Sequence, residues 1–153
     1  MPDPELGALV LIDESNWRAA LQVQVTDEQL RLVADHQPVA LVVLAKAHVQ
    51  PGGRTWEPLA FVVNGQVVAV VALARDERTM EMVNLAVDVE RQRQGIGAAV
   101  VAAAIARASQ HGLEAVELTV HPDNAPAIAL YRSSSFTPTG DLRDGEPVLR
   151  YDL

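Results

Sequence analysis

The stretch Gln92-Arg93-Gln94-Gly95-Ile96-Gly97-Ala98 decides how the chain is organised, because it joins an apolar run to a long helical pattern. The run Met80 to Val87 predicts a strand, and the spacing of apolar residues from Gly95 predicts a helix to about Gln110. Glycines at such a turn let the backbone bend tightly and approach a ligand with no Cβ atom in the way. The free amides at the helix start, with the helix dipole behind them, form an anion site that suits a pyrophosphate.

Two common phosphate-binding loops do not fit this turn. A dinucleotide fingerprint needs a third glycine where the chain has Val100, and a nucleoside-triphosphate loop needs a Gly-Lys-Ser/Thr sequence that the chain lacks. Arg91 and Arg93 add positive charge at the rim of the turn, as a pyrophosphate site requires. The alternative interpretation is a plain glycine-rich connection between a strand and a helix.

A second segment carries a matching signal, His121-Pro122-Asp123-Asn124-Ala125-Pro126-Ala127-Ile128-Ala129-Leu130-Tyr131. Asn124 and Tyr131 are seven residues apart, so on a helix they share one face roughly 10 Å apart at about 1.5 Å per residue. Each residue also has an ordinary interpretation. Asn124 is a good helix N-cap, with Pro126 tolerated in the first turn, and Tyr131 is a reasonable core aromatic.

Periodicity in the rest of the chain predicts an α/β domain over residues 1–153. Apolar runs predict strands at 7–12, 59–63, 66–74, 80–87, 115–120 and 147–153. Capping residues and helical spacing predict helices from Asp13 or Ser15 to about 23, from Thr26, at 95–110 and at 124–133. Residues 38–49 fit a strand or a helix. Asn64-Gly65 predicts a type I′ hairpin, and such hairpins imply a largely antiparallel sheet that is mixed in its second half.

Composition excludes several classes of protein. The chain has 153 residues, 49% of them apolar and 21% charged, which indicates one globular domain rather than wholesale disorder. Cysteine is absent, which excludes disulfides, thiolate metal sites and a cysteine nucleophile. The four histidines show no metal-ligand spacing. The sequence contains neither a membrane-spanning apolar run nor a secretory signal, so we expect a cytoplasmic protein.

The charge balance bears on the partner. Twenty acidic residues against twelve basic ones give a net charge of −8, which disfavours a general nucleic-acid binder. Such a charge suits a cationic small-molecule substrate. The alternative interpretation is an acidic surface that keeps the protein in solution.

Taken together, the two segments resemble the GNAT N-acetyltransferases. The pattern Gln-x-x-Gly-x-Gly at 92–97 resembles their acetyl-CoA pyrophosphate loop, and Asn124 with Tyr131 resembles their pantetheine-binding helix. The resemblance implies the GNAT fold, a mixed and mostly antiparallel sheet flanked by helices, with a splayed strand that binds the cosubstrate acetyl-CoA. The cofactor-binding residues that it implies are Leu85, Ala86, Val87, Gln92, Arg93, Gln94, Gly95, Ile96, Gly97, Ala98, Asn124 and Tyr131. Ser135 stands where the family usually has a glycine.

Other segments bear on the acceptor. The segments 12–29, 44–52 and 139–146 resemble bacterial spermine/spermidine (diamine) N-acetyltransferases, in which residues 44–52 are helical, so a polyamine is the first expectation. That group commonly has an arginine where this chain has Asn84, and 82–88 also resembles enzymes that acetylate protein N-termini. A peptide α-amine is therefore the second expectation, and a non-catalytic acyl-CoA sensor is a third. Homodimers are common among similar proteins.

A mechanism follows as a hypothesis. Without cysteine, we expect a neutral amine to attack the thioester directly in a ternary complex, with Tyr131 protonating the leaving thiolate. The backbone from Leu85 to Val87 is expected to bind the acetyl oxygen and pantetheine. Glu81 is the candidate base, because histone acetyltransferases of this superfamily place a glutamate eleven residues before the loop. Strand alternation puts Glu81 on one face with Val83 and Leu85. The alternative interpretation is that Glu81 is a solvent-exposed residue at the start of a strand. Carboxylates expected on the substrate wall are Asp27, Glu28, Asp35 and Glu57.

Overall fold

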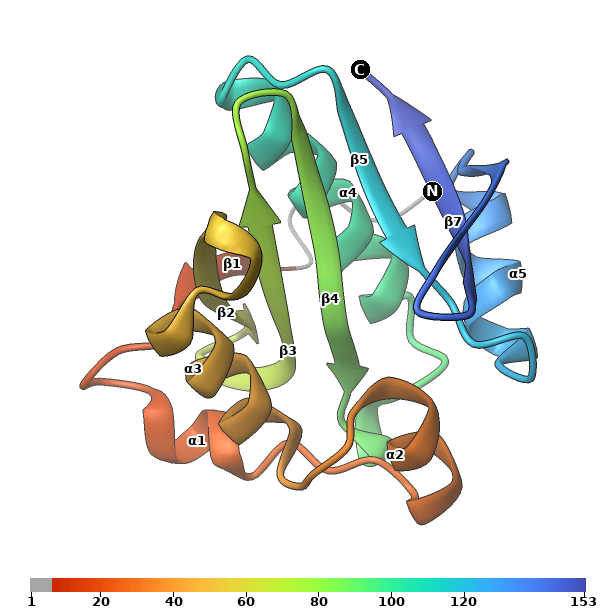
Figure 1. Ribbon diagram of the computed structural model, residues 1–153. Coiled ribbons are helices and arrows are strands. Elements are labelled where there is room, and N and C mark those ends of the chain that lie inside the picture. Colours follow the sequence, from red (N-terminus) through yellow and green to blue (C-terminus); the bar gives the residue numbers. More distant parts are fainter. Residues whose placement is uncertain (1–6) are drawn as a thin grey trace.

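A seven-stranded mixed sheet with the order β1-β2-β3-β4-β5-β7-β6 forms the centre of the molecule (Figure 1). The structure is a computed structural model, and it describes residues 7–153. The strands are β1 (Ala8–Leu11), β2 (Thr55–Val63), β3 (Gln66–Arg75), β4 (Thr79–Val87), β5 (Ala115–Thr119), β6 (Thr137–Arg143) and β7 (Glu146–Asp152). The helices are α1 (Trp17–Leu21), α2 (Asp27–Val33), α3 (Val39–Val49), α4 (Ile96–Gln110) and α5 (Ala125–Ser133), with short 3₁₀ turns at Pro51–Gly53 and Val89–Arg91. Neighbouring strands pair antiparallel except for β4 and β5, which confirms the expected sheet.

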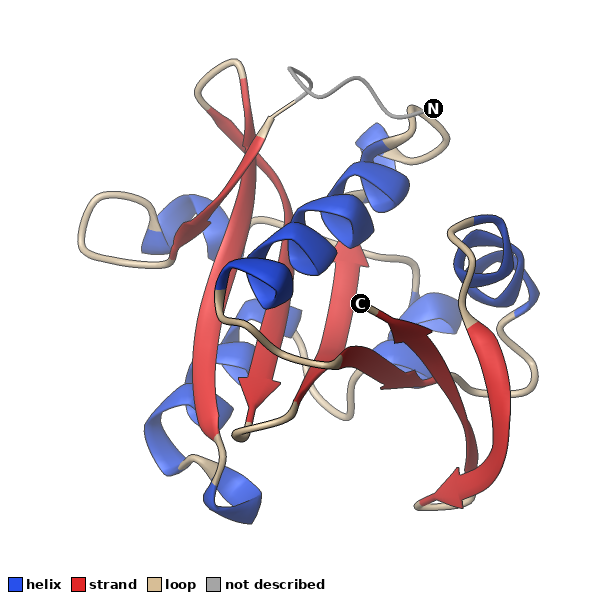
Figure 2. Ribbon diagram, turned by 90° about the horizontal axis from the view of Figure 1, so that it is seen from above, coloured by secondary structure: helices blue, strands red, loops and turns tan. Residues whose placement is uncertain are grey.

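Helices cover both faces of the sheet. One apolar cluster joins β2, β3, β4, β5 and β7 to the buried stripe of α4 and to Tyr131 of α5. A second cluster joins the opposite face of the sheet to α1 and α3. Figure 2 shows α4 crossing its face of the sheet. Within residues 7–153, every helix is too short or too polar to cross a lipid bilayer.

The strands β4 and β5 separate after a short paired segment. Their parallel ladder runs only from Thr79–Glu81 on β4 to Ala115–Glu117 on β5, and the two strands then diverge (Figure 1). Among residues 7–153, no strand therefore lies beside the edge of β4 that faces β5 from Met82 to Val87. Backbone amides and carbonyls on such an edge are free to bind a ligand.

A bulge bends β4 inside this unpaired segment. Ala72 of β3 pairs with Val83, whereas Val70 pairs with Ala86, and Asn84 between them has a φ of 56°. Asparagine is one of the few residues that tolerate this left-handed conformation. The bulge reverses the alternation, so Val83 packs in the cluster under α3 while Leu85 packs in the cluster under α4. The prediction that Glu81, Val83 and Leu85 share one face is therefore wrong at Leu85.

The helix boundaries follow local chemistry. Thr26 and Gln29 form a reciprocal capping box at the start of α2, as the sequence predicts. At α1 the N-cap is Asn16 rather than Asp13 or Ser15, and the Asp13 carboxylate instead accepts hydrogen bonds from the backbone amide and hydroxyl of Ser15. The ambiguous residues 38–49 are mostly helical as α3, which confirms the interpretation from resemblance.

The helices α4 and α5 end in the same motif with different residues. In α4, Gly112 has a φ of 70° and Leu113 N donates to the carbonyl of Ala108. In α5, Ser135 has a φ of 71° and Phe136 N donates to the carbonyl of Tyr131. Both are Schellman ends, which favour glycine at the left-handed position. The serine therefore adopts the strained conformation expected from its place in the sequence.

The candidate active site

The glycine turn leaves the start of α4 open. Gly95 caps the helix with a φ of 79°, and in the described chain no side chain bonds to the first amides of α4. The amides of Ile96, Gly97 and Ala98 are the ones that an α-helix leaves without an internal partner. This geometry makes a cradle for a diphosphate, with Arg93 exposed beside it.

Several residues predicted to bind the cofactor also have a structural role. A Cβ atom on Gly97 would lie 3.1 Å from a methyl carbon of Leu130, so this glycine lets α4 pack closely on α5. The side-chain amides of Gln92 and Gln29 bond reciprocally at 2.9 and 3.0 Å, and Gln92 also donates to the carbonyl of Val87 at 3.0 Å. The side chains of Ala86 and Ile96 are buried in the core, so only their backbones can face a ligand.

A pocket of about 780 Å³ is lined by residues on both sides of the gap between β4 and β5. On the α5 side it is lined by Asn124, Ala127 and Tyr131, and on the β4 edge by Leu85. On the other side it reaches the α2–α3 connection, the C-terminal half of α3 and the β6–β7 turn. The pocket thus connects the predicted pantetheine residues with a second region built by elements far apart in the sequence.

Asn124 and Tyr131 lie together at this pocket. Asn124 caps α5 by accepting a hydrogen bond from Ala127 N at 3.3 Å, so its N-cap interpretation is correct and it also lines the pocket. Tyr131 is buried, with its ring 6.0 Å from that of Phe136. Burial raises the pKa of Tyr131 to about 12, because the ionised phenolate would lose its hydration. The hydroxyl therefore keeps its proton at neutral pH.

Glu81 lies at the last paired rung of β4 and β5, directly beside Glu117. Two like charges at adjacent register positions repel each other. Arg143 of β6 offsets this repulsion by approaching Glu81 at 3.1 Å and Glu117 at 3.3 Å. Arg54 also contacts Glu81 at 2.9 Å, and Arg150 contacts Glu117 at 3.2 Å. Glu81 lines the pocket, while the side chain of Glu117 does not.

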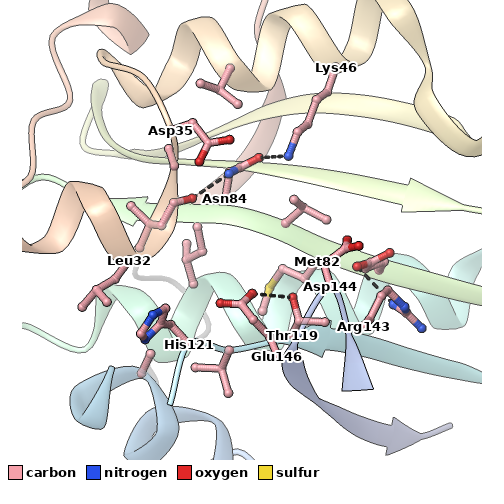
Figure 3. Close-up of a pocket in the computed structure, with 18 of the residues that line it drawn as sticks. Leu32, Asp35, Lys46, Met82, Asn84, Thr119, His121, Arg143, Asp144 and Glu146 are labelled. Atoms are coloured by element: carbon pink, nitrogen blue, oxygen red, sulfur yellow. Dashed lines mark hydrogen bonds and ion pairs between the residues drawn. The ribbon is translucent and has the colours of Figure 1, made fainter. Parts of the chain in front are cut away.

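Three other pocket carboxylates lack a cation within ion-pair distance among residues 7–153. They are Asp35 on the α2–α3 connection, Asp144 in the β6–β7 turn and Glu146 at the start of β7. Glu146 accepts a hydrogen bond from the Thr119 hydroxyl at 3.2 Å. Figure 3 shows Asp35 close to Asn84 and Glu146 beside Thr119. The expectation for Asp35 on the pocket wall is confirmed.

The other expected wall carboxylates lie elsewhere. Asp27 and Glu28 occupy the first turn of α2 and do not line the pocket. Glu57 points to the opposite face of the sheet, where it binds Arg107 of α4 at 2.5 Å and Arg75 at 2.9 Å. The Arg107 hydrogen bond and charge lower the pKa of Glu57. The expectation that Glu57 lies on the substrate wall is therefore wrong, because the sheet face of a β2 residue depends on strand register.

Lys46 and Asn84 were not assigned a role from the sequence. Lys46 Nζ donates to Asn84 Oδ1 at 2.7 Å, and Asn84 Nδ2 donates to the carbonyl of Val33 at 2.6 Å (Figure 3). These bonds tie the bulge of β4 to both α2 and α3. Partial burial lowers the pKa of Lys46, although Asp35 and Glu81 oppose that effect. An asparagine inside an apolar strand is the signal that could have marked the bulge.

Comparison with known proteins agrees with this geometry. Residues 17–136 match the Acetyltransferase (GNAT) family. A mycothiol acetyltransferase of Clavibacter michiganensis subsp. michiganensis is 45% identical over 56 residues, which are 37% of this chain and 18% of that protein. The [ribosomal protein bS18]-alanine N-acetyltransferase of Escherichia coli K12 is 36% identical over 87 residues, which are 56% of this chain and 57% of that enzyme. The matches thus span less than two thirds of either relative.

Solved structures share the fold at low identity. The GNAT domain of S. lividans PAT superposes with a TM-score of 0.77 and 20% identity, over 96% of this chain and 90% of that one. The Paia N-acetyltransferase of Thermoplasma acidophilum, solved with coenzyme A, gives a TM-score of 0.71 and 12% identity, over 96% and 99%. A glycine turn that opens α4, a splayed β4 and a matching family model over most of the chain lead to one conclusion: the chain belongs to the GNAT acetyltransferase family.

Proposed function

We propose that this protein transfers the acetyl group of acetyl-CoA to a primary amine by direct attack in a ternary complex. The observation that carries the proposal is the continuous pocket, which joins Asn124 and Tyr131 to a region with unpaired carboxylates. One end suits a thioester and its pantetheine arm. The other end suits a cationic amine, because Asp35, Asp144 and Glu146 can bind ammonium groups there.

Backbone groups would hold most of the cosubstrate. The amides of Ile96, Gly97 and Ala98 suit its pyrophosphate, and the unpaired edge of β4 from Leu85 to Val87 suits the pantetheine and the acetyl oxygen. Acetyl-CoA supplies the activated acyl group. Tyr131, which is protonated at neutral pH, donates a proton to the leaving thiolate.

We propose that Glu81 accepts the proton of the attacking amine through a water molecule. Both carboxylate oxygens already contact an arginine, Oε2 with Arg54 and Oε1 with Arg143. Each oxygen keeps a second lone pair for a water. The arginines also hold the carboxylate in one orientation toward the pocket.

A polyamine or diamine such as spermidine is the first proposed acceptor. Its several ammonium groups match carboxylates on two walls of the pocket, Asp35 on one and Asp144 with Glu146 on the other. The α-amine of a peptide is the second candidate, favoured by the 36% identity over 87 residues to an enzyme named for N-acetylation of an alanine of a ribosomal protein.

Free-thiol release from acetyl-CoA tests the proposal. The acceptor panel consists of spermidine, spermine, putrescine and peptides with free N-termini. Turnover on polyamines supports the first acceptor, and turnover on peptides alone replaces it with the second. Binding of acetyl-CoA without turnover on any amine contradicts the enzymatic proposal and favours an acyl-CoA sensor.

Two variants sharpen the assignment of the acceptor end. Asp35→Asn and Glu146→Gln should each raise the KM for a polyamine about tenfold, as expected for a lost charge-assisted hydrogen bond. The KM for acetyl-CoA should stay unchanged. Asp27→Asn is the matched control, because Asp27 lies on α2 outside the pocket lining. Equal effects of all three variants would contradict a role for the pocket carboxylates.

A further inference from the structure

Lys46 is the only lysine in the chain, and its amino group lies at the same pocket as Tyr131. The transfer to an external amine proposed for this pocket does not require Lys46. We propose that Lys46 is a self-acetylation site, to which acetyl-CoA bound in the same chain transfers its acetyl group when no other amine occupies the pocket. This inference rests on the proposed function, since it needs the same cosubstrate and the same transfer step.

The position of the amino group carries the inference. Lys46 projects from α3 toward β4, where Nζ donates to Asn84 Oδ1 at 2.7 Å (Figure 3). Asn84 forms the bulge and directly precedes Leu85, which begins the segment proposed to bind the acetyl oxygen. The bond thus holds an amine next to the strand segment where the thioester would lie. A held nucleophile reacts faster than a free one, because its orientation costs no further entropy.

The surroundings of Lys46 also favour nucleophilicity. The stem of Lys46 is partly buried and its Nζ lies 5.7 Å from the centre of the Trp56 ring. Burial lowers the pKa of Lys46, so more of the amine is neutral than for a lysine in water. Asp35 and Glu81 face the same amine and favour its charged form, so the reaction should accelerate as the pH rises.

The step balances without a further reagent. The neutral Nζ adds to the thioester carbonyl carbon, the C–N bond forms, and the C–S bond breaks. The thiolate of coenzyme A takes one proton and leaves as the free thiol, while the nitrogen loses one proton and becomes an amide. Starting from the ammonium form, one further proton passes to solvent.

Acetylation would change the acceptor end of the pocket. The amide carries no charge, so the pocket keeps Asp35 and Glu81 but loses a cation that interacts with both. The added acetyl group also occupies space in the pocket. The lost charge favours binding of an ammonium group, whereas the acetyl group blocks its path. Because the steric effect acts directly at the transfer position, acetylated protein should turn over external amines more slowly than unmodified protein.

The test uses the purified full chain and deuterated acetyl-CoA, with peptide mapping by mass spectrometry to separate Lys46 from the N-terminal amine. We expect labelling of Lys46 that approaches one acetyl group per chain, with a first-order rate that does not depend on protein concentration. Lys46→Arg should lose this label. A Lys46→Arg/Ala106→Lys chain again has a single lysine, on the exposed surface of α4, and should be labelled at least tenfold more slowly.

Each result has one meaning. Equal labelling of wild type and the double variant shows chemical acetylation alone and overturns the inference. Thiol release with external amines but no label on Lys46 overturns the inference and leaves the proposed function intact. A label on Lys46 without turnover of any external amine supports the inference and overturns the proposed acceptors. If acetyl-CoA does not bind in a calorimeter, both proposals fail.

Discussion

Replacing Tyr131 with phenylalanine removes one hydroxyl group and little else. The ring keeps its contact with Phe136, 6.0 Å away, and the hydroxyl makes no hydrogen bond to any side chain or backbone group in residues 7–153. Stability should therefore change little. If the hydroxyl protonates the leaving thiolate, kcat should fall about 10²-fold or more, because a positioned general acid contributes that much.

The pH dependence of the reaction rate tests the protonation state of Tyr131 independently. With a pKa of about 12, only about 1% of Tyr131 is ionised at pH 10, whereas half of a phenol with the ordinary value of 10.0 would be. The wild-type rate should therefore show no loss due to Tyr131 ionisation up to about pH 10. An alkaline loss of activity with a midpoint near pH 10 that is absent in Tyr131→Phe would contradict the burial argument.

The assay is thiol release at saturating acetyl-CoA and amine, with a calorimetric Kd for acetyl-CoA measured in parallel. Tyr151→Phe is the matched control, because Tyr151 is the other tyrosine of the chain and packs against the same Phe136 at 5.6 Å outside the pocket lining. We expect the Kd to change less than threefold in both variants. Equal kcat values for the two variants would refute the role of Tyr131.

Three further predictions concern stability and the base. Ser135→Gly should stabilise the protein by about 0.5–1 kcal/mol, because it removes the strain of a serine in the left-handed backbone conformation. Ser134→Gly should destabilise the protein by about the same amount, and urea unfolding measures both changes. Glu81→Gln should lower kcat about 10²-fold, as expected for loss of a general base. Glu117→Gln also removes a partner of Arg143, but Glu117 lies outside the pocket lining, so kcat should fall much less; equal losses of kcat in the two variants would exclude Glu81 as the base. Glu57→Gln should lower the free energy of unfolding by about 1–3 kcal/mol at pH 7. Because the folded-state pKa of Glu57 lies below 4.5, this difference in stability from wild type should shrink as the pH falls from about 4.5 through the lowered pKa. An undiminished difference at pH 3 would contradict the ion-pair argument.

Local patterns in the sequence were enough to predict most elements of the fold. The strands flanking Asn64-Gly65, the helix from Gly95 and the helix capped by Asn124 all depend on residues close together in the chain. The strand β6 was not predicted, because its residues are almost all exposed and include Pro138 and Gly140. Such a strand lacks the apolar alternation that marks a half-buried one.

The acceptor side of the site could be predicted only in part. Asp35 was expected on the pocket wall, but Glu146 and Arg143 come from the β6–β7 hairpin, whose position depends on pairing across the sheet. The bulge at Asn84 reverses the face of every later residue on β4. Neither the placement of a hairpin nor a one-residue bulge is visible in local periodicity.

The unpaired edge of β4 has a consequence for how the substrate specificity of this protein can evolve. Its proposed cosubstrate contacts come largely from main-chain amides, which a point substitution leaves in place. Its proposed acceptor contacts come from side chains on a connecting loop and a hairpin, where substitutions cost the core little. Under the proposed function, a descendant of this chain can therefore acquire a new amine through a few surface substitutions while its acetyl donor stays the same.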